Sequence, residues 1–328
     1  MTLQDFLTEW NSDSPTVSVH TSGSTGTPKI ISVEKKRMEA SANMTCDFLQ
    51  LKSGDTALLC MPLDYIAGKM VVVRSIVRGL RLICVPPSSN PLASLNEPPV
   101  FAAMTPMQVY QSLKNERNML KAVKHLIIGG GAIDNDIAEE LKSFPNNVWS
   151  TYGMTETLSH VAMRRLSGKN ADIWYTPLPG VKISIDADSC LMIEAPAVCP
   201  ETLHTHDLAE INRDGCRFRV LGRKDNIINS GGIKIRIEDI EDLLRPHVHI
   251  PFTVTKVCDK CLGEAVTLLA CGSKTDINII LNICESVLPK YWRPRHYFSV
   301  SYIPLTGTGK PARAEAARIA EKALLAGI

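Results

Sequence analysis

The sequence lacks the features that mark several large classes of protein. No apolar run approaches the length of a membrane-spanning helix. The N-terminal segment MTLQDFLTEWNSDS is acidic and has neither the basic nor the apolar region of a secretory signal. The net charge is only +2, which offers no electrostatic attraction to nucleic acid or to an anionic membrane. The sequence therefore predicts a cytoplasmic protein with no nucleic-acid and no membrane partner.

The cysteines lack the spacing of a metal site. Cys258 and Cys261 form one CxxC pair, but zinc would require a second pair or two suitably spaced histidines. Cys60, Cys84 and Cys271 lie inside apolar stretches, which is typical of buried, reduced thiols. We therefore expect structural thiols, and no zinc site.

Two familiar catalytic motifs are also missing from the hydroxyl-rich segment HTSGSTGTPK, residues 20–29. It is not a Walker loop, because Pro28 precedes Lys29 and Ile30 follows it. It is not a nucleophile elbow, because Gly23 directly precedes Ser24. Glycines allow close approach of backbone N–H groups, and hydroxyls and a lysine suit phosphate oxygens. The segment predicts a phosphate-binding loop of another kind, with a flexible linker as the alternative.

The order of apolar patterns predicts two domains in the 328 residues, with no internal repeat. Helix and strand patterns alternate over residues 34–149, which indicates an α/β sheet with mostly parallel strands. Hairpin patterns follow from residue 181. We predict an α/β large domain, with sheet–helix layers plus a small β region, in residues 1–222. A small, mobile α+β domain is predicted in residues 223–328, with a hinge near 223–226.

Three further segments are marked by polar groups, and two of them also contain glycine. STYGMTETLSH, residues 150–160, surrounds Glu156 with hydroxyls, and Mg²⁺ favours a few carboxylates together with phosphate oxygens. In THDLAEI, Asp207 is suited to accept from ribose hydroxyls. PLTGTGKPAR carries Lys310 between glycines and a proline. Each residue has a plainer alternative as a cap or a solvated surface charge.

In order along the chain, these segments and GRKDNIINSGGIKIRIEDIE resemble the ANL superfamily of adenylate-forming enzymes. The resemblance implies ATP and Mg²⁺ as ligands and CoA as co-substrate, with a carboxylic acid as the substrate. It implies catalytic roles for Lys310, Thr155 and Glu156, the last also binding Mg²⁺. The implied nucleotide-binding residues are Thr21, Ser22, Gly23, Ser24, Thr25, Gly26, Lys29, Gly130, Gly131, Ala132, Tyr152, Gly153, Asp207 and Arg223. The glycines of 130–132 also suit a plain strand-to-helix turn.

The same resemblance places the hinge at Asp225 and the CoA side at Gly231, Gly232 and Lys234. Within the superfamily the sequences of these motifs are most similar to those of o-succinylbenzoate–CoA ligases of menaquinone biosynthesis. That acid carries a second carboxylate, so Lys69 and Arg74 are candidate substrate residues. The alternative for both is a surface charge on a helix. Tyr65 is predicted to line the acyl channel.

The chain departs from the family pattern at three places. One is PLDYIAG, where Tyr65 stands at a position that is usually an aromatic residue or a histidine. Fewer residues precede the phosphate loop than in typical members, so one wall of the acyl pocket is expected to be minimal or supplied by a second subunit, as in a homodimer. The ribose motif reads Thr-His-Asp, which puts His206 where the family has glycine. Three alternative functions stay open: another acyl- or aryl-CoA ligase, an adenylating enzyme that loads a carrier protein, and a non-catalytic nucleotide-binding relic.

Overall fold

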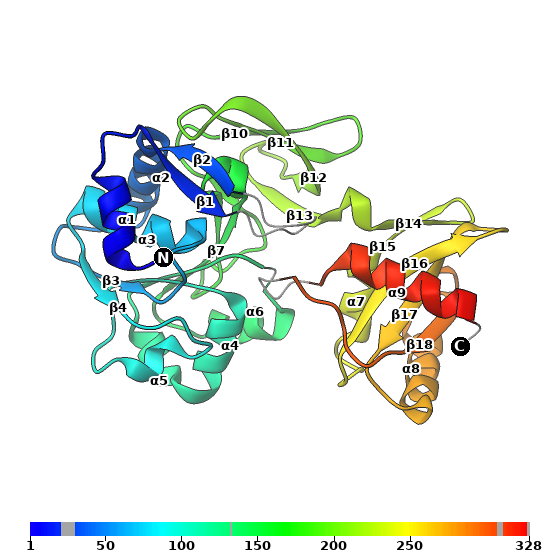
Figure 1. Cartoon of the computed structure of the whole chain (residues 1–328). Helices are drawn as coiled ribbons and strands as arrows, with labels where there is room; N and C mark the ends of the chain where they lie inside the picture. Colours follow the sequence, from blue (N-terminus) through cyan, green and yellow to red (C-terminus); the bar gives the residue numbers. More distant parts are fainter. Residues whose placement is uncertain (21–29, 132, 307–310, 327–328) are drawn as a thin grey trace. The chain divides into compact units, whose positions relative to one another are not determined.

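The computed structural model describes residues 1–20, 30–131, 133–306 and 311–326. Contacts among them divide the chain into two compact units (Figure 1). The described part of the first unit comprises residues 1–20, 30–131, 133–205 and 210–219, and that of the second 206–209, 220–306 and 311–326. The mobility of the C-terminal region and the hinge at 223–226 stay predictions.

A seven-stranded sheet forms the centre of the first unit, in the order β4-β3-β5-β6-β7-β8-β9. Its first five strands pair in parallel, as the alternating sequence pattern predicts. β8 and β9 add an antiparallel edge. The strands are β3 (Thr56–Leu59), β4 (Arg81–Cys84), β5 (Phe101–Met104), β6 (His125–Ile128), β7 (Asn147–Gly153), β8 (His160–Arg165) and β9 (Thr176–Pro177).

Successive residues of a strand point to opposite faces of the sheet, so each face presents apolar side chains against which helices can pack. Leu58, Ala102 and Leu126 pack with side chains of three helices, α4 (Pro106–Asn115), α5 (Arg117–Ala122) and α6 (Asn135–Lys142). The Asp134 side chain caps α6 by accepting from the Asp136 N–H. Two more helices, α2 (Lys35–Phe48) and α3 (Ile66–Arg78), pack on each other, and α3 contacts β3 and β4. A short helix η1 (Pro91–Ser94) contacts α4.

The N-terminal segment forms a helix and a hairpin that the sequence patterns did not predict. Helix α1 (Leu3–Trp10) begins with a capping box in which Thr2 and Asp5 exchange hydrogen bonds. Strands β1 (Thr16–His20) and β2 (Ile30–Glu34) pair antiparallel, with His20 opposite Ile30. These two residues flank segment 21–29, so the hairpin holds both ends of the predicted phosphate loop together.

A separate four-stranded sheet has the order β10-β11-β12-β13. Its strands are β10 (Lys182–Ile185), β11 (Cys190–Ala195), β12 (Cys199–Ile211) and β13 (Phe218–Arg223). The predicted hairpins are present: β10 pairs antiparallel with β11, and β12 and β13 are neighbours joined by a turn at Asp214–Gly215. This sheet confirms the predicted small β region.

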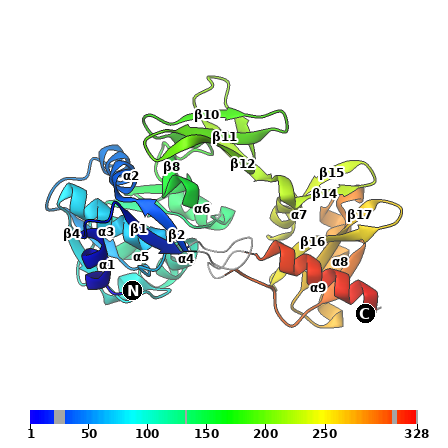
Figure 2. The ribbon, with the colours of Figure 1, turned by 45° about the horizontal axis from the view of Figure 1, so that its top comes forward.

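The second unit is an α+β arrangement with its own core. Its sheet has the order β15-β14-β17-β16, with β18 paired to β17. Two apolar clusters form: one includes side chains of α7 and α8, and the other side chains of α9. Figure 2 shows the backbone of these helices and of the sheet. The elements are η3 (Lys224–Asn226), β14 (Ile227–Ser230), β15 (Ile233–Arg236), α7 (Ile237–Leu244), β16 (Phe252–Asp259), β17 (Gly263–Ala270), α8 (Lys274–Val287), η4 (Lys290–Trp292), β18 (His296–Ser299) and α9 (Arg313–Ala326).

The cysteines correct one expectation. Cys60 is buried and Cys271 is half-buried, but Cys84 is exposed, because it ends the edge strand β4. Cys258, near the end of β16, and Cys261, in the turn between β16 and β17, are also exposed. No cluster of metal-binding side chains occurs among the residues that the structure describes. Within the same residues, no helix is both long and apolar enough to span a bilayer.

Candidate functional site

The predicted nucleotide-binding residues Gly130 and Tyr152 lie where two neighbouring parallel strands end. β6 ends at Ile128 and is followed by the glycine turn, in which Gly130 has φ +83°, a conformation that glycine adopts readily. Thr151 of β7 donates its hydroxyl to the Ile128 carbonyl over 3.1 Å. Open α/β sheets bind ligands beyond the carboxyl ends of their strands. The geometry therefore suits a ligand site at this edge.

The ring of Tyr152 packs against two other aromatic side chains. Its ring centroid lies 5.1 Å from that of Phe218 and 5.9 Å from that of Tyr175. Tyr175 is itself fixed, because its hydroxyl lies 2.7 Å from that of Ser150. Aromatic packing of this kind favours a defined orientation of the rings. Tyr152 is half-buried, so part of its surface stays open to solvent.

The turn after β7 brings two strands unusually close. A Cβ at Gly153 would lie 2.2 Å from the Ser159 carbonyl oxygen, so only glycine fits there. The hydroxyl of Thr157 donates toward the carbonyls of Met154 and Ser159, at 3.0 and 2.7 Å. Leu158 adopts φ +63°, which is rare for a leucine and often marks a functional site.

This turn carries the two predicted catalytic residues of the first unit. Thr155 is half-buried and Glu156 is exposed on the short helix η2 (Thr155–Thr157). One accessible carboxylate suits Mg²⁺ that is held mainly by phosphate oxygens. Glu156 would then hold Mg²⁺ together with the triphosphate.

Lys69 and Arg74 correct the sequence prediction in part. The surface alternative is wrong for both, because their exposed fractions are 1% and 2%. Lys69 pairs with Glu9 at 3.7 Å and donates to the Ser18 carbonyl. Burial lowers the pKa of Lys69, and Glu9 partly offsets the effect. Lys69 therefore ties α3 to the N-terminal segment.

Arg74 has no such partner. Its guanidinium donates to the Ser159 hydroxyl over 2.7 Å. None of the carboxylates in the described part of the chain pairs with it, and its Nε is buried without a hydrogen-bond partner. Burial lowers the pKa of Arg74 to about 10, so the group remains charged at neutral pH. A buried, uncompensated cation is costly unless an anion joins it.

The predicted ribose and hinge residues form one hydrogen-bonded group in the second unit. Arg223 contacts Asp207 at 3.4 Å and Asp225 at 3.1 Å. His206, the departure from the family pattern, contacts both carboxylate oxygens of Asp225 at 2.9 Å. Burial alone would raise the pKa of Asp225, but hydrogen bonds from His206 and Arg223 outweigh it and lower that pKa. The contact between His206 and Asp225 was not predicted.

The predicted CoA-side residues lie at a hairpin turn. Strands β14 and β15 pair with each other, and Ser230 lies opposite Ile233. Gly231 and Gly232, which connect the two strands, have positive φ. The Gly231 N–H donates to the Leu262 carbonyl over 2.9 Å. Lys234 is exposed. Tyr65 stands immediately before α3, is 37% exposed and forms a bridge with His20.

The remaining predicted residues lie outside the described part of the chain. These are Thr21, Ser22, Gly23, Ser24, Thr25, Gly26, Lys29, Ala132 and Lys310. Their roles stay predictions.

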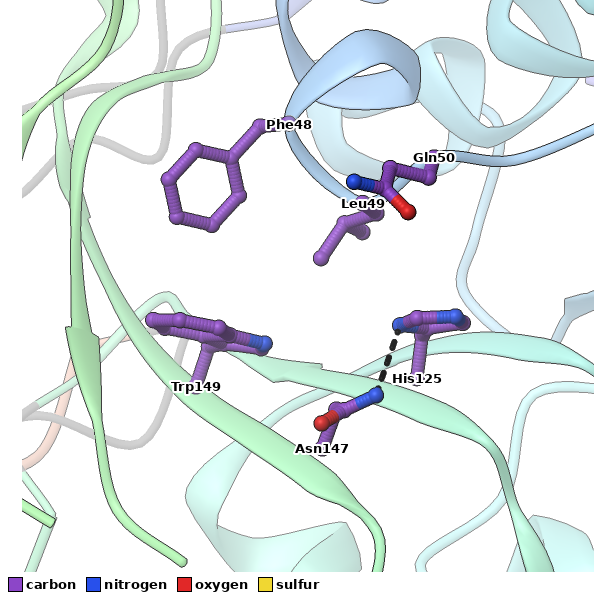
Figure 3. Close-up of a pocket in the computed structure, with 6 residues that line it drawn as sticks. All are labelled: Phe48, Leu49, Gln50, His125, Asn147 and Trp149. Carbon is purple, nitrogen blue, oxygen red and sulfur yellow. Dashed lines mark hydrogen bonds between the residues drawn. The ribbon is translucent and has the colours of Figure 1, made fainter. Parts of the chain in front are cut away.

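A small cavity of about 160 Å³ occurs at the opposite ends of β6 and β7 (Figure 3). His125 and Asn147, the first residues of these strands, line it together with Trp149 and the end of α2. Burial lowers the pKa of His125. Because it adjoins the amino ends of the strands, this cavity is distinct from the predicted nucleotide site.

Comparisons with known proteins agree with the ordered motifs. A family model described as "AMP-binding enzyme" matches residues 4–191, more than half of the chain. A 2-succinylbenzoate–CoA ligase of Bacillus mycoides is 24% identical over 93% of this chain and 70% of its own length.

Two solved structures are also similar. An acyl-CoA synthetase (AMP-forming)/AMP-acid ligase II-like protein of Dyadobacter fermentans is 33% identical, with a TM-score of 0.64 over 95% of this chain and 91% of that one. The Bacillus subtilis o-succinylbenzoate–CoA synthetase in complex with ATP and magnesium is 22% identical, with a TM-score of 0.76 over 91% and 69% of the two chains, and supports the fold. The chain therefore belongs to the AMP-binding (ANL) family, as an enzyme of the AMP-forming acyl-CoA ligases.

Proposed function

We propose that this enzyme converts o-succinylbenzoate into its CoA thioester through an acyl-adenylate. The observation that carries the proposal is Arg74, a buried cation that no described carboxylate neutralises. Its contact with Ser159 places it beside the turn that carries Glu156. A second carboxylate on the acid would supply the missing negative charge. Relatives that are about 25% identical and are named as ligases of this acid support the family. The choice of acid rests on Arg74.

In the proposed mechanism, a carboxylate oxygen of the acid attacks the α-phosphorus of ATP and pyrophosphate leaves. The thiolate of CoA then attacks the acyl carbon and AMP leaves. Segment 21–29 would bind the phosphates, Tyr152 would cover the adenine, and Asp207 with Arg223 would bind the ribose. Thr155 would contact the α-phosphate, and Lys310 would neutralise charge in the first step. Catalysis is then mainly positioning and charge neutralisation.

A pyrophosphate-release screen tests the acid. The pure protein is given ATP, Mg²⁺ and each of a panel of acids, with and without CoA. We expect o-succinylbenzoate to be turned over faster than benzoate or fatty acids, with thioester formed only when CoA is present. Preference for a monocarboxylic acid would refute the acid but keep the family. Adenylation that needs a carrier protein, and not CoA, would favour the carrier-loading alternative. Inactivity on every acid would favour the relic.

We also propose that the second unit moves about Asp225 between the two half-reactions. The Asp225→Pro variant fixes φ and removes a backbone N–H, so the thioester step should fall by about 10²-fold while adenylation changes much less. Single-turnover assays of each half-reaction measure this. Asp225→Asn is the matched control, because it changes the contacts with His206 and Arg223 but leaves the backbone free. Equal loss of both steps in the proline variant would contradict a hinge.

A further inference from the structure

Arg74 is one end of a buried chain of hydrogen bonds within the first unit. Its guanidinium contacts the Ser159 hydroxyl at 2.7 Å, and that hydroxyl lies 3.2 Å from Nδ1 of His160. Nε2 of His160 lies 3.0 Å from the Thr45 hydroxyl, which in turn lies 3.1 Å from the Ser41 carbonyl on α2. His160 is 7% exposed and Thr45 is completely buried. The chain therefore links α3, β8 and α2.

The donors and acceptors of this chain can be assigned in one direction. A carbonyl only accepts, so the Thr45 hydroxyl donates to Ser41 and must accept from Nε2–H of His160. At the other end an arginine only donates, so the Ser159 oxygen accepts from Arg74. The Ser159 hydroxyl hydrogen is then free to bond to Nδ1 of His160. All four contacts are satisfied together when His160 is neutral and carries its hydrogen on Nε2.

The surroundings favour this neutral form. Burial, and then the positive charge of Arg74, lower the pKa of His160 well below its ordinary value. An imidazolium would present a second N–H toward Ser159, and the hydroxyl hydrogen would lose its acceptor. When His160 is neutral, Arg74 is the positively charged residue of this hydrogen-bonded group.

We infer that His160 is a positioning residue, which holds Ser159 in one orientation and thereby fixes the Arg74 guanidinium for the second carboxylate of the acid. This inference rests on the proposed function. It assigns a role to a residue that touches neither the acid nor the nucleotide in the proposed site. It also explains why a neutral hydroxyl, that of Ser159, accepts from Arg74. A carboxylate at the position of Ser159 would neutralise the guanidinium before the substrate bound.

Three full-length proteins test the inference: the wild type, His160→Leu and His160→Gln. Leucine removes both hydrogen bonds, whereas glutamine offers one acceptor and one donor. We expect His160→Leu to raise KM for o-succinylbenzoate about tenfold, with KM for ATP changed by less than about twofold. His160→Gln should recover most of the loss. Proportional changes in both KM values, with no recovery in His160→Gln, would overturn the inference.

A spectroscopic measurement keeps the inference separate from the choice of acid. Ring ¹⁵N signals of His160, identified by their absence from the glutamine variant, should report a neutral imidazole with hydrogen on Nε2 at pH 7. Hydrogen on Nδ1, or an imidazolium, would overturn the assignment even if the enzyme uses o-succinylbenzoate. If the enzyme uses another acid, the proposed function fails, while the ring signals still decide the tautomer. If His160→Leu does not fold, Thr45→Val removes the acceptor of the Nε2–H group instead, and an unchanged KM for o-succinylbenzoate in that variant would overturn the inference.

Discussion

The Lys310→Ala variant is expected to form acyl-adenylate about 10²–10³-fold more slowly than the wild type, because it removes one preorganised positive donor from the transition state. In the proposed mechanism this ammonium neutralises both the α-phosphate and the attacking carboxylate. Lys310 itself lies outside the described residues, but Leu305 and Pro311 on either side of its segment form a bridge. The described residues that flank the segment are therefore paired with each other.

The thioester step should survive in Lys310→Ala when preformed acyl-adenylate and CoA are supplied. Melting curves should change little, because the glycines and the proline around Lys310 in the sequence predict a loop and not a core position, and substitutions away from the core are usually worth within about 0.5 kcal/mol. Lys290→Ala is the matched control, because Lys290 is exposed on η4 in the same unit. A folded Lys310→Ala variant that adenylates at nearly the wild-type rate would show that this lysine is not the adenylation lysine.

The Arg74→Met variant is expected to be more stable than the wild type and much less active. Methionine keeps most of the side-chain volume and removes a buried charge without a carboxylate partner, so the free energy of unfolding should rise by about 1–4 kcal/mol. The same change removes the proposed partner of the second carboxylate. We expect kcat/KM for o-succinylbenzoate to fall by about 10²–10³-fold. Denaturant titration and steady-state assays measure the two effects.

Arg78→Met is the matched control for Arg74→Met. Arg78 lies one turn further along α3 but is partly exposed and pairs with Asp47 at 2.5 Å. Loss of this surface pair should cost about 0–1 kcal/mol and leave the use of the acid unchanged. If Arg74→Met destabilises the protein and keeps full activity, the guanidinium serves the fold and not the substrate.

Much of the secondary structure could be predicted from the sequence, because periodicity and local signals agree. Met38, Ala42 and Cys46 recur at helical spacing within the alternating region, and all three are completely buried in α2. The turn at Asp214–Gly215 joins two strands as its residue types suggest. Parallel pairing followed from the alternation of helices and strands. Each of these features depends on neighbours in sequence.

The features that the sequence did not predict depend on distant contacts. Lysine and arginine are usually exposed, so surface positions were an alternative for Lys69 and Arg74. That alternative is wrong because α3 is buried on more sides than a surface helix. The hairpin of β1 and β2 joins strands on either side of the predicted loop, without a short turn to signal it. The contact of His206 with Asp225 joins residues on β12 and η3. The sequence showed His206 as a departure, but not its partner.

The separate apolar cores of the two units have a consequence for calorimetry. The second unit buries its own apolar side chains between its sheet and α7, α8 and α9, and the first unit does so around its own sheet. Heat absorption by such a chain need not occur as one cooperative transition, and a single midpoint then describes neither unit. The stabilising effect expected for Arg74→Met should appear in the transition of the first unit alone. A ligand that binds only that unit should likewise shift that transition and leave the other in place.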